Sequence, residues 1–243
     1  MKTAPLTPRM LIAAGVVGGA VLAGMAALWM APRHDLSVMP LMARYTTPDG
    51  HDISVQTHEL TINEWNLCHA EGGCTLHLRP PVGRADKDYP ATGLSWVDVR
   101  EYIDWINAST GQKFRLPSMA EWHAMAAPVL PEEPDPIFTD PALSWASAYL
   151  TDGLGSRRLE PSGSYSVSAE GIADLDGNVW EWTQDCATGA DVSADSCPAF
   201  YVMGEHETVI SYLIRDPARG GCAMGAPPAH LGMRLVLEEQ PGG

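Results

Sequence analysis

The hydrophobic pattern of the chain begins with one long uncharged segment, residues 10–32, which reads MLIAAGVVGGAVLAGMAALWMAP. Lys2 and Arg9 precede this segment. About 20 apolar residues are enough for a helix to cross a bilayer, and flanking basic residues favour the cytoplasmic side. The pattern predicts a signal-anchor helix over 10–32, a basic cytoplasmic tail over 1–9 and a tether over 33–48. Removal of the segment as a cleaved signal peptide is the alternative.

Beyond the tether, the pattern changes to short amphipathic segments that share one start signal. A Ser or Thr is followed three residues later by Glu or Asp in TINE from Thr61, SWVD from Ser95 and SMAE from Ser118. Such pairs form capping boxes at helix N-termini, so these acidic residues are expected to be structural, not catalytic. The second predicted helix has four apolar residues on one face: Val99, Tyr102, Ile103 and Ile106.

Short strands are predicted between and after these helices. KFRLP follows the second helix, SYSV covers residues 164–167, and LGMRLVLE covers residues 231–238. In the last segment, alternation predicts Met233, Leu235 and Leu237 on one face and Arg234, Val236 and Glu238 on the other. Short helices and strands joined by long loops predict an α+β fold, in one domain over residues 49–240.

The net charge limits which classes of molecule the protein can bind, and the cysteines indicate the cellular compartment in which it folds. The formal net charge of −15 argues against nucleic acid as a partner. The five cysteines include two close pairs, Cys68 with Cys74 and Cys186 with Cys197, and Cys222 is left over. In an exported protein these spacings favour two local disulfides. The alternative, a metal cluster, lacks paired C-x-x-C spacing.

The segment DLDGNVWEW, residues 174–182, combines hard oxygen ligands with large apolar surface. Asp174, Asp176 and Asn178 alternate around Gly177, and two tryptophans follow within five residues. One interpretation is an Asx turn whose tryptophans enter the core, with no metal ion. The other is a site in which these oxygens bind a cation.

Four segments resemble the formylglycine-generating-enzyme (sulfatase-modifying-factor) family and occur in the order expected of it. They are TINEWNLC with GGC, GLSWVDVREYIDWINASTGQKFRLPSMAEWHAMA, GIADLDGNVWEW and HLGMRLV. RLPSMAEW together with GNVWEW is a specific pair of motifs, and the resemblance covers nearly all of the extracytoplasmic part. It implies a compact α+β fold with little regular secondary structure, distantly related to C-type lectins.

The resemblance also implies a calcium ion bound around GNVWEW. Side-chain oxygens would come from Asp174 and Glu181, and main-chain carbonyls from Leu175, Gly177 and Val179. Ca²⁺ takes six to eight such hard oxygens. The two tryptophans would then be buried and hold the loop rigid.

The copper chemistry of the family is not expected to be retained. The resemblance implies that oxidases of this family bind Cu(I) through two cysteines and convert the cysteine of a C-x-P-x-R motif to formylglycine. Counting back from Arg219 in PAR, the two cysteine positions fall at His206 and Ser211. Cys222 is the only nearby thiol, and one cysteine cannot reproduce a dithiolate site. His206, Ser211 and Cys222 remain the candidate catalytic residues of a rearranged site.

Three functions are open at this point. The segments EWNLCHAEGGCTLHLR and GLSWVDVREYIDWIN are similar to the NirV branch, the nitrite reductase accessory proteins of denitrification. That similarity favours a membrane-anchored periplasmic accessory or maturation factor for another exported protein. The alternatives are a formylglycine-generating or related oxygen-dependent oxidoreductase with a rearranged metal site, and a lectin-like or peptide-binding module. The expected location is the inner (cytoplasmic) membrane with the domain in the periplasm, or secretion after cleavage.

Overall fold

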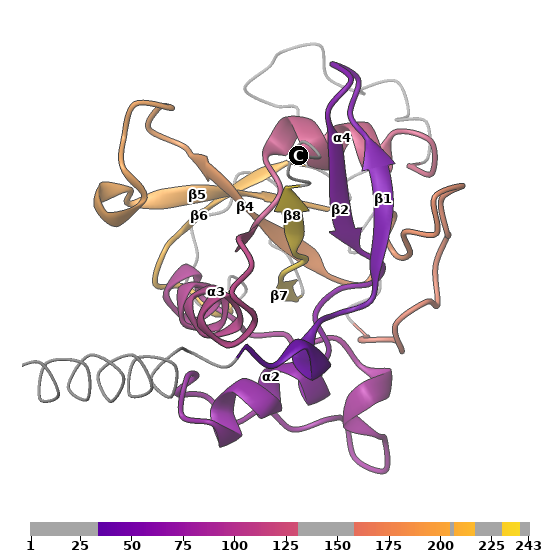
Figure 1. Ribbon diagram of the computed structural model, residues 1–243, viewed down its shortest axis with the longest axis vertical. Helices are drawn as coiled ribbons and strands as arrows, with labels where there is room; N and C mark the ends of the chain where they lie inside the picture. The colour runs from indigo at the N-terminus through magenta and orange to yellow at the C-terminus, as the bar shows by residue number, and fades with distance from the viewer. Residues whose placement is uncertain (1–33, 131–157, 205–206, 217–229, 239–243) are drawn as a thin grey trace, which may run out of the picture. The chain divides into compact units, whose positions relative to one another are not determined.

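The computed structural model describes residues 34–130, 158–204, 207–216 and 230–238 (Figure 1). The chain divides into two units, residues 1–35 and 36–243, and the helices and strands of the described residues lie in the second. No helix within the described residues is long and apolar enough to cross a membrane. Residues 10–32 lie outside them, so the signal-anchor helix stays a prediction.

Two four-stranded sheets form the frame of the second unit (Figure 1). The first sheet has the order β1-β2-β8-β3 and is antiparallel. Its strands are β1 (Met42–Thr46), β2 (Asp52–Gln56), β3 (Phe114–Arg115) and β8 (Val236–Glu238). The second has the order β6-β5-β4-β7, in which only β4 and β7 pair in parallel. Its strands are β4 (Trp180–Cys186), β5 (Ala199–Met203), β6 (Thr208–Ser211) and β7 (Leu231–Gly232).

The three α-helices of the described residues begin where the capping boxes predicted. They are α2 (Ile62–Ala70), α3 (Trp96–Thr110) and α4 (Met119–Ala126), and the short 3₁₀ turns are η1 (Leu36–Val38), η2 (Asp86–Asp88) and η4 (Ala194–Ser196). In each α-helix the N-cap hydroxyl and the third-residue carboxylate form both reciprocal hydrogen bonds. Gly111 ends α3 in the left-handed conformation that glycine adopts without strain. The prediction of a mixed α+β fold is confirmed.

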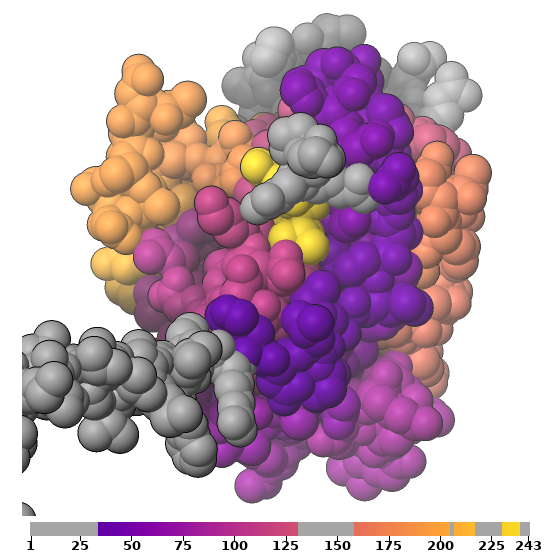
Figure 2. All heavy atoms as spheres, viewed as in Figure 1, coloured from indigo at the N-terminus to yellow at the C-terminus, as the bar shows by residue number. Residues whose placement is uncertain are grey.

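The folded unit begins earlier than the predicted boundary. Residues 42–46, which the sequence placed in the tether 33–48, form β1 and pair with β2 along their whole length, from Met42 opposite Gln56 to Thr46 opposite Asp52. In Figure 2 yellow C-terminal atoms lie between indigo and magenta atoms, and the sheet order places β8 between β2 and β3. Residues 42–46 therefore belong to the fold.

The predicted C-terminal strand 231–238 is instead two strands in different sheets. β7 lies beside β4, and β8 lies between β2 and β3. Between them Arg234 is fully buried, although alternation placed it on the face opposite Met233 and Leu235, and these two residues are buried as well. A period of two cannot show that the chain leaves one sheet for the other. The predicted strand 164–167 contributes only an isolated bridge, Val167 with Ala173.

Tryptophan side chains anchor the core and satisfy their own polar atoms. Trp65 and Trp182 are fully buried, and their indole N–H groups donate to the carbonyls of Leu76 (2.9 Å) and Leu94 (2.8 Å). Trp182 also meets Trp96 edge to face, with 6.2 Å between ring centroids. A buried indole needs such a partner, because an unpaired N–H in an apolar core is costly. The core therefore fixes loop carbonyls as well as side chains.

Both predicted disulfides are confirmed. Cys68 is bonded to Cys74 at the end of α2, and Cys186 is bonded to Cys197, which joins the end of β4 to the residue after η4. Cys222 lies outside the described residues. Each bridge closes a short loop over six or eleven positions of sequence separation, so each stabilises a local connection.

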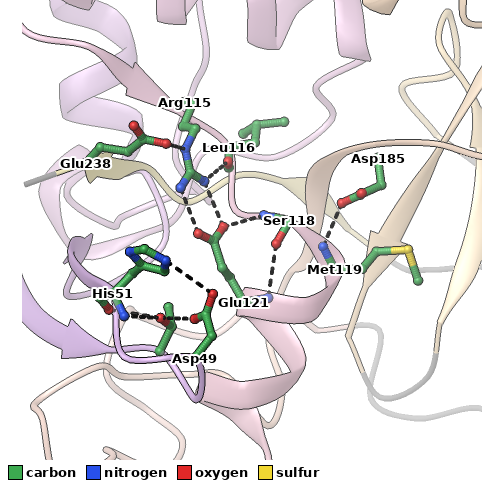
Figure 3. A network of polar contacts seen from close by, with 10 residues as sticks. Asp49, His51, Arg115, Leu116, Ser118, Met119, Glu121, Asp185 and Glu238 are labelled. Atoms are coloured by element: carbon green, nitrogen blue, oxygen red, sulfur yellow. Dashed lines mark hydrogen bonds and ion pairs between the residues drawn. The ribbon is translucent and has the colours of Figure 1, made fainter. Parts of the chain in front are cut away.

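Two of the capping carboxylates also hold an arginine from elsewhere in the chain. Arg115 of β3 donates to both oxygens of Glu121 in α4, each at 2.7 Å, and to Glu238 of β8 at 3.2 Å (Figure 3). Arg215, after β6, donates to both oxygens of Asp98 in α3, each at 2.7 Å. The pair with Arg215 ties the N-terminus of α3 to a segment 117 residues away in the sequence. The pair with Arg115 ties the N-terminus of α4 to β3 and, through Glu238, to β8, which a capping box alone does not do.

The Asp98 pair has a consequence for stability at acid pH. Burial alone would raise the pKa of Asp98, but hydrogen bonds from Arg215 and Ser95 outweigh burial and lower that pKa. The contribution of Asp98 is therefore complete above the pKa of an unfolded aspartate, about 3.9, and is lost as pH falls through the lower folded pKa. We expect Asp98→Asn to lower the free energy of unfolding by about 1–3 kcal/mol near neutral pH.

Urea unfolding across a pH series measures this effect. The control is Asp104→Asn, an exposed position on the same helix. Wild type and the Asp104 variant should lose stability more steeply below pH 4 than Asp98→Asn. If the free energy of unfolding fell equally steeply below pH 4 for all three proteins, the lowered pKa of Asp98 in the folded state would be contradicted.

Candidate functional site

The segment 174–182 folds as a tight loop that leads into β4. Asp174 and Asn178 have positive φ angles of 63° and 71°. Only short polar side chains such as Asp and Asn adopt this left-handed region with any frequency besides glycine. At Gly177 an added Cβ would lie 2.3 Å from the ring of Tyr165. The alternation of Asp, Asp and Asn around glycine therefore reflects the backbone that the loop requires.

The oxygen side chains of this loop bind the preceding segment, residues 160–166. Each accepts main-chain N–H groups from it: Asp174 from Gly163 and Tyr165 (2.9 Å for Tyr165), Asp176 from Ser166 (3.0 Å), and Asn178 from Glu160 (3.0 Å). The Ser166 hydroxyl also donates to Asp176. In this arrangement the side chains of the motif hold residues 160–166 in place, a segment that belongs to neither sheet.

Glu181 of β4 forms a fully buried ion pair with Arg234. The guanidinium donates to both Glu181 oxygens at 2.8–3.1 Å, and the indole N–H of Trp122 donates to the same carboxylate at 3.0 Å. The remaining Arg234 donors bind the carbonyls of Gln56 (3.0 Å) and Ala173 (2.7 Å). Burial alone would lower the pKa of Arg234, but Glu181 outweighs it and raises that pKa.

Glu59 is a further acidic residue of this region that sequence reasoning missed. It is fully buried, and neither carboxylate oxygen has a hydrogen-bond partner among the described residues. Burial raises the pKa of Glu59 well above its ordinary range; Arg234 opposes the rise, and Asp174 and Glu181 add to it. No local pattern marks Glu59, since it approaches these residues only through the fold. The only feature of the sequence that could have pointed to Glu59 is its position directly before Leu60, an apolar residue that is buried in the structure.

The charges of this region suit a divalent cation. Glu59, Asp174 and Glu181 carry three negative charges when ionised, against one positive charge on Arg234. Uncompensated buried charge is costly, by several kcal/mol for each ion, and Ca²⁺ would balance the remaining two. As the side chains lie, no three acidic, His or Cys groups within the described ranges are arranged to hold a metal.

To bind calcium as predicted, Asp174 and Glu181 would have to give up some of their present hydrogen-bond partners. The side chains of Asp174 and Glu181 are held by main-chain amides and by Arg234, so Ca²⁺ would have to compete with those contacts. The carbonyl of Gly177 accepts from Val179 at 3.0 Å. The orphaned carboxylate of Glu59 fits an added cation, whereas the paired carboxylates do not offer free oxygens. The calcium site stays a prediction, with Glu59 as an added ligand candidate.

Thermal unfolding tests the calcium prediction. If the folded state alone binds Ca²⁺, calcium at one hundred times its Kd adds about 2.7 kcal/mol of stability, and EDTA removes it. We expect Glu59→Gln to abolish this dependence without weakening the protein in EDTA, because the carboxyl of Glu59 has no hydrogen-bond partner among the described residues for the variant to lose. We expect Glu181→Ala also to abolish it, with a lower Tm in EDTA because Arg234 is left unpaired.

The control is Asp191→Asn, an exposed acidic position away from this loop in sequence. It should retain the calcium response of the wild type. Wild-type melting curves that coincide in EDTA and in excess calcium would rule out the site.

The candidate catalytic residues are not assembled into a site by the described part of the structure. Ser211 is exposed at the end of β6. His206 and Cys222 lie outside the described residues. Of the five cysteines in the chain, four are in disulfides. Cys222 is the one that the two bridges leave, so the chain cannot supply two thiolates to one copper ion while both bridges are intact.

An open pocket of about 520 Å³ has Tyr212, the residue that follows Ser211 in the sequence, in its lining. It is lined by Trp96, Val97 and Arg100 of α3, by residues 194–198, and by Tyr212. Arg100 and Asp195 form an ion pair across it at 3.0 Å. Val97 and Tyr212 are 40% and 38% exposed, and the adjacent Leu213 is 61% exposed. The pocket thus combines aromatic and aliphatic surface with a charged pair.

The fold and its motifs place the chain in a known family. The sequence matches the Sulfatase-modifying factor enzyme 1-like domain over residues 11–239. The chain therefore belongs to this family, which agrees with the resemblance seen in the capped-helix and GNVWEW segments. The specific NirV branch is a finer assignment and stays a proposal.

Curated relatives share parts of the chain. It is 30% identical over 126 residues to the formylglycine-generating enzyme of Mycobacterium tuberculosis, covering 46% of this chain and 39% of that enzyme. It is 32% identical over 134 residues to the serine/threonine-protein kinase Pkn1 of Chlamydia trachomatis, covering 55% of this chain and 19% of the kinase. The chain thus matches well under half the length of either relative.

A solved structure supports the fold over a longer span. PvdO from Pseudomonas aeruginosa matches 85% of this chain and 97% of its own, with a TM-score of 0.54 and 19% sequence identity. At this identity the likeness shows the shared fold alone. Activity has to be argued from this chain's own residues.

Proposed function

We propose that this protein is a member of the family that has lost copper oxidation and acts as an accessory factor that binds another exported protein. One observation carries the proposal: the two disulfides use four of the five cysteines. Cu(I) oxidation in the manner of the family needs a pair of thiolates. The frame of the fold is retained while that pair is not available, which favours recognition over redox chemistry.

The pocket beside Ser211 is the proposed recognition surface. Ser211 occupies one of the two positions that the resemblance assigns to copper cysteines, and Tyr212 lines the pocket. Aromatic and aliphatic side chains with a polar rim are typical of surfaces that bind peptide segments. The ion pair of Arg100 with Asp195 gives the rim one charge of each sign. The proposed ligand is an extended segment of the partner protein.

The proposed location is the outer face of the inner membrane, in the periplasm. Disulfides persist in oxidising compartments outside the cytoplasm, and both pairs are bonded here. The uncharged segment 10–32 would provide the anchor. A NirV-like role, as an accessory factor of nitrite reductase in denitrification, is the specific form of the proposal.

A peptide assay separates recognition from oxidation. We expect the full-length protein, supplied with copper and oxygen, to leave the cysteine of a C-x-P-x-R peptide unchanged in mass. Conversion to the aldehyde that is lost in Cys222→Ser would instead establish an oxidoreductase with a rearranged site. Either result is read by mass spectrometry of the peptide.

Capture of partners from native membranes then tests the pocket. Tyr212→Ala is expected to reduce recovery of the partner, because the ring forms part of the pocket wall. Val82→Ala, at a fully exposed position away from the pocket lining, is the control. Equal recovery by wild type and by both variants would place recognition elsewhere on the protein.

Reporter fusions test the membrane topology. A reporter that is active only in the periplasm should work when fused to the C-terminus, and a reporter restricted to the cytoplasm should not. Deletion of residues 10–32 should abolish export. Activity of the cytoplasmic reporter on the intact chain would refute the proposed orientation.

A further inference from the structure

His69 and His77 lie side by side at the end of α2, beside the Cys68–Cys74 disulfide. Their ring centroids are 5.3 Å apart and the ring planes meet at 66°. His69 is half-buried in the last turn of the helix, and His77 is exposed in the chain that follows. Neither residue takes part in the calcium region or in the pocket beside Ser211. The pair thus has no role in the functions considered above.

The protonation of His69 leaves one nitrogen available as a ligand. Its Nδ1 lies 3.0 Å from the carbonyl oxygen of Cys74. A carbonyl can only accept, so Nδ1 carries the proton and the neutral ring keeps its lone pair on Nε2. Metal-binding histidines commonly donate their other nitrogen to a carbonyl in this way, which fixes both tautomer and ring orientation.

The chain on both sides of His77 is held by the helix that carries His69. The carbonyl of Leu76 accepts from the indole of Trp65 at 2.9 Å. Leu78 exchanges two hydrogen bonds with the side chain of Asn66, each at 3.0 Å. Trp65 and Asn66 both belong to α2. The backbone of His77 is therefore fixed relative to His69 before any ligand arrives.

The spacing of the rings fits a shared metal ion. With metal–nitrogen bonds of about 2.0–2.1 Å and tetrahedral angles, two imidazoles on one ion have centroids roughly 5 Å apart. The observed separation of 5.3 Å agrees with this value. Imidazole suits Cu²⁺, Zn²⁺ and Ni²⁺, whereas Ca²⁺ and Mg²⁺ prefer oxygen. The net charge of −15 favours cation approach over the whole surface.

We propose that His69 and His77 form a two-histidine site for a divalent transition metal that prefers imidazole. His69 at the end of α2 and His77 in the chain that follows would each supply one nitrogen, and the other coordination positions would be taken by water or by a ligand from a partner. Such a site binds Cu²⁺ more tightly than Zn²⁺, in the general order of affinities for nitrogen ligands.

Titration of the full-length protein with Cu²⁺ tests the site. Calorimetry measures the affinity, and nitrogen hyperfine splitting in the electron paramagnetic resonance spectrum reports the number of coordinated nitrogens. We expect a spectrum with two coordinated nitrogens. We expect His69→Ala and His77→Ala each to weaken binding at least about tenfold, since even the loss of an outer partner of a ligand has this effect. His51→Ala and His123→Ala, at two other surface histidines, should bind as the wild type does.

Three further arms complete the test. Zn²⁺ should compete for the site, and Ca²⁺ in excess should not. Asn66→Ala should weaken Cu²⁺ binding while both histidines remain, because Leu78 is released. Circular-dichroism melting checks that His77→Ala stays folded, as its exposed ring predicts. Unchanged Cu²⁺ affinity in His77→Ala, an equal loss in His51→Ala, or displacement by Ca²⁺ would each overturn the proposal.

Discussion

The guanidinium of Arg234 is the point at which the two sheets are joined. It lies in the chain between β7 of one sheet and β8 of the other, and it binds Glu181 of β4 and the carbonyl of Gln56 in β2. All of these groups are buried. Loss of one partner from such a pair leaves an uncompensated charge and typically costs about 3–5 kcal/mol. The pair therefore constrains how the sheets can pack.

The same interaction explains why so many polar groups surround the GNVWEW segment. Arg234 also binds the carbonyl of Ala173, directly before Asp174, so the loop is attached to the pair at both ends. Asp174 in turn holds the segment that precedes it. Acidic residues outnumber basic ones in this region, and the carboxylate of Glu59 has no hydrogen-bond partner among the described residues. This imbalance of charge is the basis of the calcium prediction.

The polar residues with structural roles are not the residues for which a function is proposed. The capping carboxylates Asp98 and Glu121 each hold an arginine, and those contacts stabilise helix–strand junctions. The two disulfides contain four of the five cysteines, so two thiolates are not available to bind one copper ion while both disulfides are intact. The proposed functions lie on the surface, at the pocket beside Ser211 and at the histidine pair, of which His69 lies in the last turn of α2 and His77 in the chain that follows. A retained frame with altered surface chemistry is consistent with family membership without the family's oxidation reaction.

The sequence by itself determined the local features of this protein. The starts of three helices, the glycine end of α3 and both disulfides followed from residues no more than eleven positions apart, where local spacing constrains the geometry. The family followed from short motifs and their order along the chain. Only the tertiary structure decided what depends on distant segments: that residues 42–46 form a strand, that 231–238 divides between two sheets, and that Arg234 and Glu59 are buried. Periodicity reports which face of an element is apolar, and it cannot report which other element covers that face or which charge meets it there.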